Sequence, residues 1–340
     1  MKNWKVKFSS ASVEFIFDGK FSGIHKWADK KHAIYITDEN VYAIHENKFK
    51  GKKTIVLPAG EEHKQPSTVD FIIESLLNFG ATRSSILVGV GGGVVTDLVG
   101  YVAGIYMRGV SFGFVPTTIL AMVDAAVGGK NGIDIGLYKN MVGLIRQPAF
   151  IFYDYDFLTT LPIHQWQNGF AEVIKHAAIK EAKMMQELVH HDILYYQKNK
   201  KSLASLLERN VQIKIKVVQK DEFEKGDRKL LNLGHTLGHA IENQHALLHG
   251  HAISIGMVYA AKISQVLKGF SQVGELIDTL TKYGLPTKMH IDVHQTMELI
   301  QKDKKKVTAG IQYVLLQKIG KGTYETIPMK SLEKLIKLYS

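Results

Sequence analysis

Short apolar, β-branched runs alternate with helical patterns along the first half of the chain. Helical patterns fall near residues 40–48, 67–79, 94–107 and 117–126. Strand patterns occur in HAIYIT (32–37), KTIVLP (53–58), SSILVGV (84–90), SFGFVP (111–116) and AFIFYD (149–154). Strands that alternate with helices of this length predict an α/β fold with a doubly wound parallel sheet.

The pattern changes after LTTLP, at residues 158–162. Long amphipathic helices follow, with almost no strand signal until IQYVLLQKIG and GTYETIP near 311–327. We therefore expect a domain boundary near 160, with an α/β domain over 1–160 and a helical domain over 161–340.

One segment of the second half, RKLLNLGHTLGHAIE at 228–242, predicts a single helix with a polar stripe. At 100° per residue, the stripe covers an arc of about 80° and faces away from the leucines. Its members are Arg228, Asn232, His235, His239 and Glu242. Gly234 and Gly238 lie within this segment and cost a helix roughly 1 kcal/mol each relative to alanine. Their presence suggests that a substrate or a packed neighbour approaches the backbone closely.

The histidines of this stripe are either solvated surface groups or part of a metal site. LLHGHA follows directly and adds His249, while NGFAEVIKHAAI upstream places Glu172 and Lys175 three residues apart on one helix face. Two imidazoles and one carboxylate would leave a divalent metal with open positions, so we select Glu172, His235 and His249 as ligands. HTLGH lacks the glutamate of the zincin motif.

Composition limits the other possibilities. The 340 residues contain no cysteine, which excludes thiolate metal sites, disulfides and cysteine nucleophiles. A signal peptide and an apolar run long enough to span a membrane are both missing from the sequence, so we expect a soluble, cytoplasmic protein. The net charge of +11 raises a nucleic-acid or membrane partner as an alternative. Its lysines are scattered along helical segments, however, which argues against both partners.

A glycine turn in SSILVGVGGGVVTDLVG lies between a predicted strand and a predicted helix. Gly91, Gly92 and Gly93 stand where a pyrophosphate would meet backbone N–H groups, although a tight turn without a ligand has the same pattern. A second glycine pair in VDAAVGGKNGIDIGLYKNMVG has Lys130 and Lys139 beside it as potential phosphate partners. This second segment favours the phosphate-binding interpretation.

Taken together, these segments resemble the 3-dehydroquinate synthases, which belong to the sugar-phosphate cyclases. The resemblance runs nearly end to end. Its motifs are LPAGEEHK (57–64), GGGVVTDLVG (91–100), YMRGV (106–110), VPTTILAMVDAAVGGK (115–130), LYKNMVG (137–143), FAEVIKHA (170–177), KIKVVQKDEFEKGDRKLLNLGHTLGHAIE (214–242), LLHGHA (247–252) and DKKKVTAG (303–310).

The resemblance implies a Rossmann-like N-terminal domain, an all-α C-terminal domain and an active site in the cleft between them. It also implies bound NAD, a divalent metal that is usually zinc, and the same three metal ligands. The residues implied to contact NAD are Asp38, Gly60, Glu61, Lys64, Gly93, Val94, Val95, Thr96, Asp97, Thr117, Thr118, Lys130, Lys139, Phe157, Leu158, Thr159 and Thr160.

The family's substrate is 3-deoxy-D-arabino-heptulosonate 7-phosphate, which the enzyme oxidises, strips of phosphate, reduces and closes by an aldol step into 3-dehydroquinate. Its carboxylate and phosphate require several cations. The residues implied to contact it are Asp124, Lys130, Asn140, Lys175, Lys214, Arg228, Asn232, His239 and Lys304. An arginine matching Arg108 reaches the phosphate of the partner's substrate in the family, which implies a homodimer.

For three of these residues, a purely structural role is the alternative to contact with the substrate. His239, one turn after His235, is our candidate to move the hydroxyl proton, or it only supports a metal ligand by a hydrogen bond. Lys175 and Lys214 lie near Glu172 and Asp221 in sequence and would equally form ion pairs.

The chain departs from the family's usual VDSSVGGKTGVNHPLGKN pattern. The differences are Ala125, Ala126, Asn131, Asp134 and Ile135, together with Thr96 in place of a glycine and His251 in place of a glutamate. The alternatives that remain are a cyclase of the same fold acting on glucose 6-phosphate or sedoheptulose 7-phosphate, and a metal-dependent polyol dehydrogenase that would release NADH.

Overall fold

The computed structural model describes residues 1–136, 138–245, 247–303 and 310–340. The chain folds into two compact units. Unit 1 comprises Met1–Pro162 and Leu207–Glu222, and unit 2 comprises Ile163–Leu206 and Phe223–Ser340. The sequence placed one boundary near 160, whereas in the structure the later segment 207–222 also belongs to unit 1.

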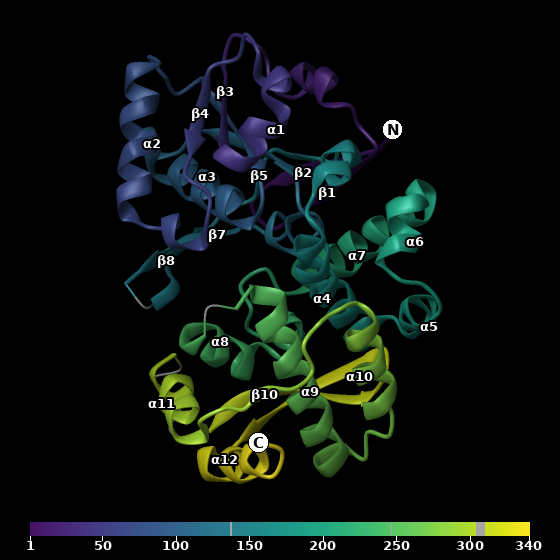
Figure 1. Cartoon of the computed structure of the whole chain (residues 1–340). Coiled ribbons are helices and arrows are strands. Elements are labelled where there is room, and N and C mark those ends of the chain that lie inside the picture. The colour runs from purple at the N-terminus through teal and green to yellow at the C-terminus, as the bar shows by residue number, and fades with distance from the viewer. Residues whose placement is uncertain (137, 246, 304–309) are drawn as a thin grey trace. The chain divides into compact units, whose positions relative to one another are not determined.

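Unit 1 is built on a seven-stranded sheet in the order β1-β2-β9-β6-β5-β3-β4 (Figure 1). Every neighbouring pair is parallel except β1 with β2. The strands are β1 (Lys2–Lys7), β2 (Ser12–Phe17), β3 (Ala33–Asp38), β4 (Thr54–Leu57), β5 (Ile86–Gly91), β6 (Ser111–Pro116) and β9 (Phe150–Phe152). The five predicted strands and the parallel α/β sheet are confirmed, and the antiparallel pair β1–β2 was not predicted.

Helices connect the parallel strands, as the alternating pattern indicated. The helical segments of unit 1 are η1 (Phe21–Lys26), α1 (Glu39–Phe49), η2 (Glu61–His63), α2 (Pro66–Asn78), α3 (Gly93–Ile105), η3 (Tyr106–Arg108), η4 (Ala121–Ala125) and η5 (Tyr155–Thr160). The first three α-helices match their predicted ranges closely. The helix predicted at 117–126 is instead short and centred on the π-helical turn η4.

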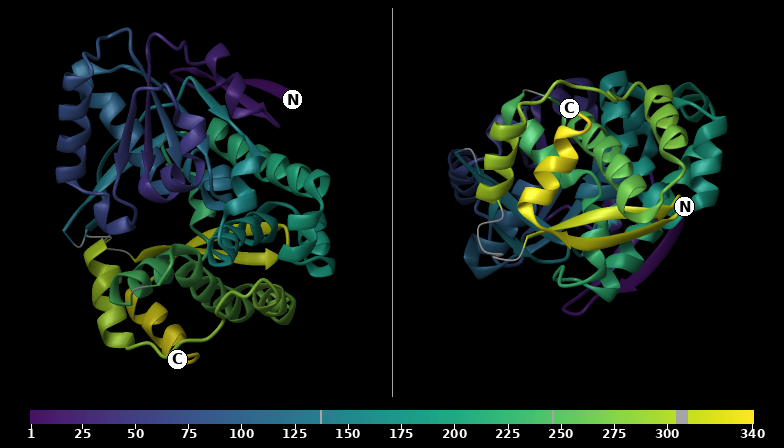
Figure 2. Two further views of the ribbon diagram at one scale, coloured as in Figure 1. Left: turned by 45° about the horizontal axis from the view of Figure 1, so that its top comes forward. Right: turned by 90° about the horizontal axis from the view of Figure 1, so that it is seen from below.

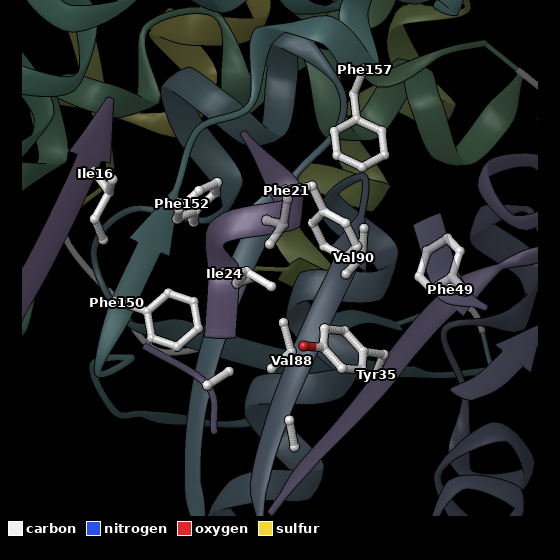
Figure 3. Close-up of a cluster of buried hydrophobic side chains, with 13 residues drawn as sticks. Ile16, Phe21, Ile24, Tyr35, Phe49, Val88, Val90, Phe150, Phe152 and Phe157 are labelled. Atoms are coloured by element: carbon white, nitrogen blue, oxygen red, sulfur yellow. The ribbon is translucent and has the colours of Figure 1, made fainter. Parts of the chain in front are cut away.

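The core beside this sheet contains aromatic side chains from several segments (Figure 3). Phe21 of η1 packs edge-on against Tyr35 of β3 and Phe157 of η5, with ring centroids 5.9 and 5.8 Å apart. All three rings are at most 3% exposed. Edge-to-face packing of this kind adds to the area-dependent hydrophobic stabilisation. It also anchors η5 beside the carboxyl end of the sheet.

A separate antiparallel hairpin follows η4 in unit 1. It consists of β7 (Lys130–Ile135) and β8 (Tyr138–Ile145). The sequence predicted potential phosphate partners in this glycine-rich stretch, Lys130 and Lys139, but no strands. Several apolar side chains of the hairpin are exposed, including Tyr138 at 53% and Met141 at 64%.

Unit 2 is mainly helical. Its helices are α4 (Ile163–Lys180), α5 (Ala182–His190), α6 (Ile193–Lys198), η6 (Asp227–Asn232), α8 (His235–Gln244), α9 (His249–Lys268), α10 (Val273–Lys282), α11 (Val293–Asp303) and α12 (Met329–Lys337). Helix α7 (Lys200–Lys220) begins in unit 2 and continues into the segment that belongs to unit 1. The strand signals near 311–327 form the hairpin β10 (Ile311–Lys318) and β11 (Lys321–Ile327), so unit 2 is not purely helical. This hairpin packs on α4 and α9 (Figure 2).

The prediction of a single helix over 228–242 is wrong. The structure has the 3-10 helix η6, then a break, and α8 begins at His235. Gly234 lies at the break with a left-handed φ of +80°. A Cβ there would come 2.7 Å from both Ile253 O and Met257 N of α9, so glycine is required sterically as well.

The predicted reason for the two glycines, a closely packed neighbour, is confirmed. A Cβ at Gly238 would lie 2.7 Å from Cδ1 of Ile253. From the opposite side, a Cβ at Gly256 of α9 would lie 2.0 Å from Gly234 O. Helices α8 and α9 are therefore in backbone contact, which fixes the start of each helix relative to the other. Among the described residues, no helix has the length and apolar character needed to cross a membrane.

Candidate functional site

Except for Lys130 and Lys139 of the β7–β8 hairpin, the residues predicted to contact NAD lie at or after the carboxyl ends of five parallel strands in unit 1. Asp38 ends β3, the segment Gly60–Lys64 comes after β4, and Gly93–Asp97 comes after β5. Thr117 follows β6, and η5 comes after β9. Because the carboxyl ends of parallel strands meet at one edge of a sheet, these segments share the edge where open α/β sheets bind ligands.

The glycine turn leaves the first N–H groups of α3 without a side-chain cap. Gly92 is the N-cap residue and accepts no capping hydrogen bond, and the first turn of α3 carries no acidic residue. Gly91 is sterically required, since a Cβ there would lie 2.5 Å from Cγ2 of Val95. An uncapped helix N-terminus of this kind can hold a phosphate through its N–H groups. The buried Thr117 hydroxyl has no hydrogen-bond partner among the described residues and fits a missing ligand.

Lys64 joins three of the predicted segments. Its ammonium donates to Oδ2 of Asp97 and to Oδ1 of Asn140, at 2.6 Å in both cases. Asn140 has a left-handed φ of +55°, and its N–H donates to Oδ1 of Asp134 at 2.7 Å. The unusual Asp134 therefore holds a predicted substrate residue in place.

The electrostatics of this group follow from burial and pairing. Burial alone lowers the pKa of Lys64, but the carboxylates of Asp97 and Glu61 outweigh burial and raise it above its usual value. Burial raises the pKa of Asp97, while Lys64 opposes the shift. Burial likewise raises the pKa of Glu61 and of Asp38. Lys64 is therefore charged at neutral pH.

Two predicted substrate residues of unit 1 contact each other. The Lys214 ammonium donates to the backbone oxygen and to Oδ1 of Asp124, at 2.5 Å each. Asp124 thus reaches Lys214 from 90 residues away in the chain. Asn131, another departure from the family pattern, donates from Nδ2 to Gly129 O and Arg146 O and so ties the start of β7 to the end of β8.

In unit 2, α4, α8 and α9 bring Glu172, His235 and His249 together. Oε1 of Glu172 lies 3.7 Å from Nε2 of His235 and 3.6 Å from Nε2 of His249. The carboxylate is fully buried, whereas both imidazoles are partly exposed. Ligand atoms about 2.0–2.2 Å from a tetrahedral metal lie roughly 3.3–3.6 Å from one another. Both carboxylate–imidazole separations are close to this spacing, and all three ligand atoms lie within 4.8 Å of one another, so the group could hold a divalent ion.

The other nitrogen of each imidazole faces an acceptor. Nδ1 of His235 lies 3.1 Å from the backbone oxygen of Leu233, and Nδ1 of His249 lies 3.2 Å from Oε2 of Glu242. Such acceptors favour the tautomer in which Nδ1 carries the proton and Nε2 is available to a metal. The sequence placed Glu242 on the polar stripe but did not select it as a site residue.

The two histidines differ in charge. Burial and the Lys175 ammonium hold the pKa of His235 well below its usual value, so this imidazole is neutral. Burial also lowers the pKa of His249, but the carboxylates of Glu172 and Glu242 outweigh burial and raise the pKa to about 9.

The remaining predicted residues of unit 2 lie near this cluster or on its neighbouring segments. Lys175 forms an ion pair with Oε2 of Glu172, three residues earlier on α4. The ring centroid of His239 lies 5.2 Å from that of His235 and 6.0 Å from that of His249. Asn232 donates to Oε1 of Glu224 at 2.5 Å, and Arg228 is buried on η6.

Lys304 lies outside the described residues. Arg108 and Lys130 are exposed, and Arg108 has a left-handed φ of +65° at the end of η3. His251, which stands where the family pattern has glutamate, is two residues after His249, and burial lowers its pKa.

Solved structures share this fold across the whole chain. A 2-deoxy-scyllo-inosose synthase, complexed with carbaglucose-6-phosphate, NAD+ and Co2+, has a TM-score of 0.85 and 25% identity, with 100% of both chains covered. ValA, the 2-epi-5-epi-valiolone synthase from Streptomyces hygroscopicus subsp. jinggangensis 5008, with NAD+ and Zn2+ bound, has a TM-score of 0.88 and 22% identity, with 98% of each chain covered. The second likeness shows the fold alone.

Relatives identified by sequence have a higher sequence identity to this chain than these two solved structures. The 3-dehydroquinate synthase of Pyrococcus furiosus is 42% identical over 82% of this chain and 82% of its own. The 3-dehydroquinate synthase of Bacillus pumilus is 38% identical over 98% of this chain and 97% of its own. Residues 54–168 match the family described as 3-dehydroquinate synthase N-terminal, and residues 169–306 match 3-dehydroquinate synthase C-terminal. The chain therefore belongs to the 3-dehydroquinate synthase family.

Proposed function

We propose that this chain converts 3-deoxy-D-arabino-heptulosonate 7-phosphate into 3-dehydroquinate and phosphate, a step of the shikimate pathway that leads to aromatic amino acids. In this proposal residues 1–160 bind NAD, and residues 161–340 bind the metal and most of the substrate. The observation that carries the proposal is the convergence of Glu172, His235 and His249 in a chain of this family. When bound, NAD takes up and returns a hydride, and the metal acidifies the substrate hydroxyl as a Lewis acid.

Glu172, His235 and His249 are the proposed metal ligands. Their donor set of two imidazoles and one carboxylate suits zinc or cobalt and leaves positions open for the substrate. The Lys175 ammonium pairs with Oε2 of Glu172 and so orients that carboxylate. The absence of cysteine from the chain is consistent with this oxygen and nitrogen set.

The chain's cations bind the two anionic ends of the substrate. Lys130, Lys175, Lys214, Arg228 and Lys304 form this proposed set, with Asp124, Asn140 and Asn232 binding hydroxyl groups. Arg228 and Lys214 are at most 6% exposed, and cations in such surroundings attract an anion more strongly than solvated ones. His239 is the proposed group that moves the hydroxyl proton, because its ring lies next to that of His235.

NAD is proposed to lie along the strand ends of unit 1. Gly93 to Asp97 would cover the pyrophosphate through the uncapped N-terminus of α3. Asp38, Gly60, Glu61 and Lys64 would lie near the adenosine, with Thr117, Thr118, Lys130, Lys139 and Phe157–Thr160 nearby. The buried Thr117 hydroxyl, which has no hydrogen-bond partner in the part of the chain that the structure describes, supports this placement.

Homodimer formation is part of the same proposal. Exposed apolar side chains on the β7–β8 hairpin and at the end of α3 are a suitable contact surface. These are Ile105, Met107, Ile135, Tyr138, Met141, Val142 and Ile145. Arg108 stands beside Met107 in an exposed left-handed turn and would reach the partner's phosphate. Sedimentation at micromolar concentration should give a dimer, and a monomer would contradict this part.

A cytoplasmic location without nucleic-acid or membrane partners completes the proposal, and cell fractionation tests it.

Two assays test the reaction itself. Protein given the heptulosonate, NAD and zinc or cobalt should release phosphate without accumulating NADH. Turnover of glycerol with NADH release would instead indicate a polyol dehydrogenase, and phosphate release from glucose 6-phosphate or sedoheptulose 7-phosphate alone would indicate another cyclase. Elemental analysis should find metal in the native chain and none in the His235→Ala variant.

A further inference from the structure

The two ring nitrogens of His249 face different carboxylates. Nε2 lies 3.6 Å from Oε1 of Glu172, and Nδ1 lies 3.2 Å from Oε2 of Glu242. We propose that Glu242 is a positioning residue for the metal centre: it accepts the Nδ1–H of His249 and thereby holds Nε2 toward the ion. This inference rests on the proposed metal centre and adds a residue that the sequence did not select.

His249 needs such a partner because of its place in the chain. It is the first residue of α9, and its preceding N-cap residue, Leu248, makes no side-chain cap. Its side chain is 28% exposed, whereas that of His235 is 12% exposed. His235 obtains its acceptor locally, from the carbonyl of Leu233 two residues earlier. His249 obtains its acceptor from the neighbouring helix α8.

Glu242 is well placed for this role. It lies near the end of α8, and the backbone contact of Gly234 and Gly238 with α9 holds that helix against the one that carries His249. The Glu242 side chain is 8% exposed, so its charge is largely removed from water. A buried carboxylate is tolerated when it is paired, and an imidazole that donates to it becomes a better metal ligand.

The geometry distinguishes a positioning role from a ligand role. His239, Glu242 and His249 could hold an ion among themselves. An ion there would take the Nδ1 side of His249, yet the Nε2 side already faces Glu172 and, through it, His235. Because the two nitrogens of one ring point in different directions, one ion cannot use both. The Nε2 side has the fully buried carboxylate and two imidazoles, and we assign the ion to it.

Metal affinity of the purified full-length chain tests the inference. Zinc and cobalt dissociation constants are measured by competition with a chromophoric chelator for the wild type, Glu242→Ala, Glu242→Gln and Asn243→Ala, and stoichiometry by elemental analysis. Removing a partner of this kind weakens metal binding by about 10- to 100-fold, which we expect for Glu242→Ala with one ion still bound at saturation. Glu242→Gln keeps an acceptor oxygen and should fall between Glu242→Ala and the wild type. Asn243 is exposed on the same turn of α8, and its variant should match the wild type.

Several results would overturn the inference. Wild-type affinity in Glu242→Ala would show that Glu242 does not position His249, while the proposed metal centre would stand. Complete loss of the ion from Glu242→Ala, or a changed absorption spectrum of the cobalt bound to Glu242→Gln, would make Glu242 a ligand instead. If Glu242→Ala fails to fold, Glu242→Gln decides, and equal affinity to the wild type rejects the role. Failure of the wild type itself to bind metal would contradict the proposed function rather than this inference.

Discussion

The ammonium of Lys64 lies 2.6 Å from the carboxylate of Asp97, and the two side chains are 5% and 19% exposed. The same ammonium donates to Asn140 on β8. One cation thus joins the segment before α2, the first turns of α3 and the β7–β8 hairpin. The packing of these three segments, which include predicted NAD-binding residues, therefore depends on the Lys64 side chain.

Replacing Lys64 with methionine should lower the free energy of unfolding by about 3–5 kcal/mol, because the change leaves a buried carboxylate unpaired. Asp97→Asn alone should cost less, since the carboxylates of Glu61 and Asp134 still offset the charge of Lys64 and Asn140 still accepts its hydrogen bond. A double-mutant cycle measured by urea unfolding gives the coupling between the two residues. Additive costs would show that the pair does not interact.

The cost of Lys64→Met should shrink as the pH falls from about 7 toward about 5. Burial already raises the pKa of Asp97 above its usual value, and loss of Lys64 raises it further. The folded variant then binds a proton that the unfolded chain does not, so stability falls as pH rises through the folded pKa and is recovered on acidification. Unfolding curves at several pH values test this, with Lys64→Met/Asp97→Asn as the control that should lack the part of the effect due to Asp97 and keep only that of Glu61.

Gly256→Ala should destabilise unit 2 by at least about 1–3 kcal/mol through overpacking. Its Cβ would lie 2.0 Å from Gly234 O, and this backbone atom cannot move without displacing the start of α8. Metal affinity should fall as well, because the displaced Gly234 directly precedes the proposed ligand His235. Gly274→Ala in α10 is the matched control, since nothing lies within 4 Å of its Cβ, and it should change stability by less than about 1 kcal/mol. Thermal unfolding that shows no difference between the two variants would contradict the packing argument.

Asp134→Ala should weaken the β7–β8 hairpin by about 0.5–1.5 kcal/mol, because it removes the acceptor of the Asn140 N–H. Asp134→Asn should be nearly neutral, since its amide oxygen can accept the same hydrogen bond. If Asn140 contacts the substrate as proposed, KM should rise in the alanine variant and change little in the asparagine variant. Denaturant unfolding and steady-state kinetics provide the two measurements, and equal KM values would remove Asp134 from this role.

Arg108→Ala and His235→Ala should each be inactive alone but complement each other when mixed. In a hybrid dimer, the subunit with an intact metal site would receive Arg108 from its partner. Random mixing of two symmetric dimers makes half the molecules hybrids with one working site, so about one quarter of wild-type activity should return. The assay is phosphate release after co-refolding or co-expression. No recovery would show that Arg108 acts within its own chain.

The sequence determined the parallel strands of unit 1 well, because five buried strands read as continuous β-branched runs between helical patterns. It did not reveal β2, which is parallel to β9, or β1, whose residues Lys2–Lys7 are largely exposed and lysine-rich. It also missed β7 and β8, where glycines and exposed apolar residues obscure the alternation of a hairpin. The helix over 228–242 was wrong because periodicity takes no account of the left-handed backbone at Gly234.

By itself the sequence determined the residue types that the chemistry needs and their order along the chain, since motif spacing and helical periodicity are local properties. Glu172, His235 and His249 could be selected in this way. Only the tertiary structure decided that Glu242 lies on the Nδ1 side of His249, that Lys214 pairs with Asp124, and that Lys64 holds both Asp97 and Asn140. Each of these contacts joins residues from different elements, so its existence depends on how helices and strands pack, which no local pattern specifies.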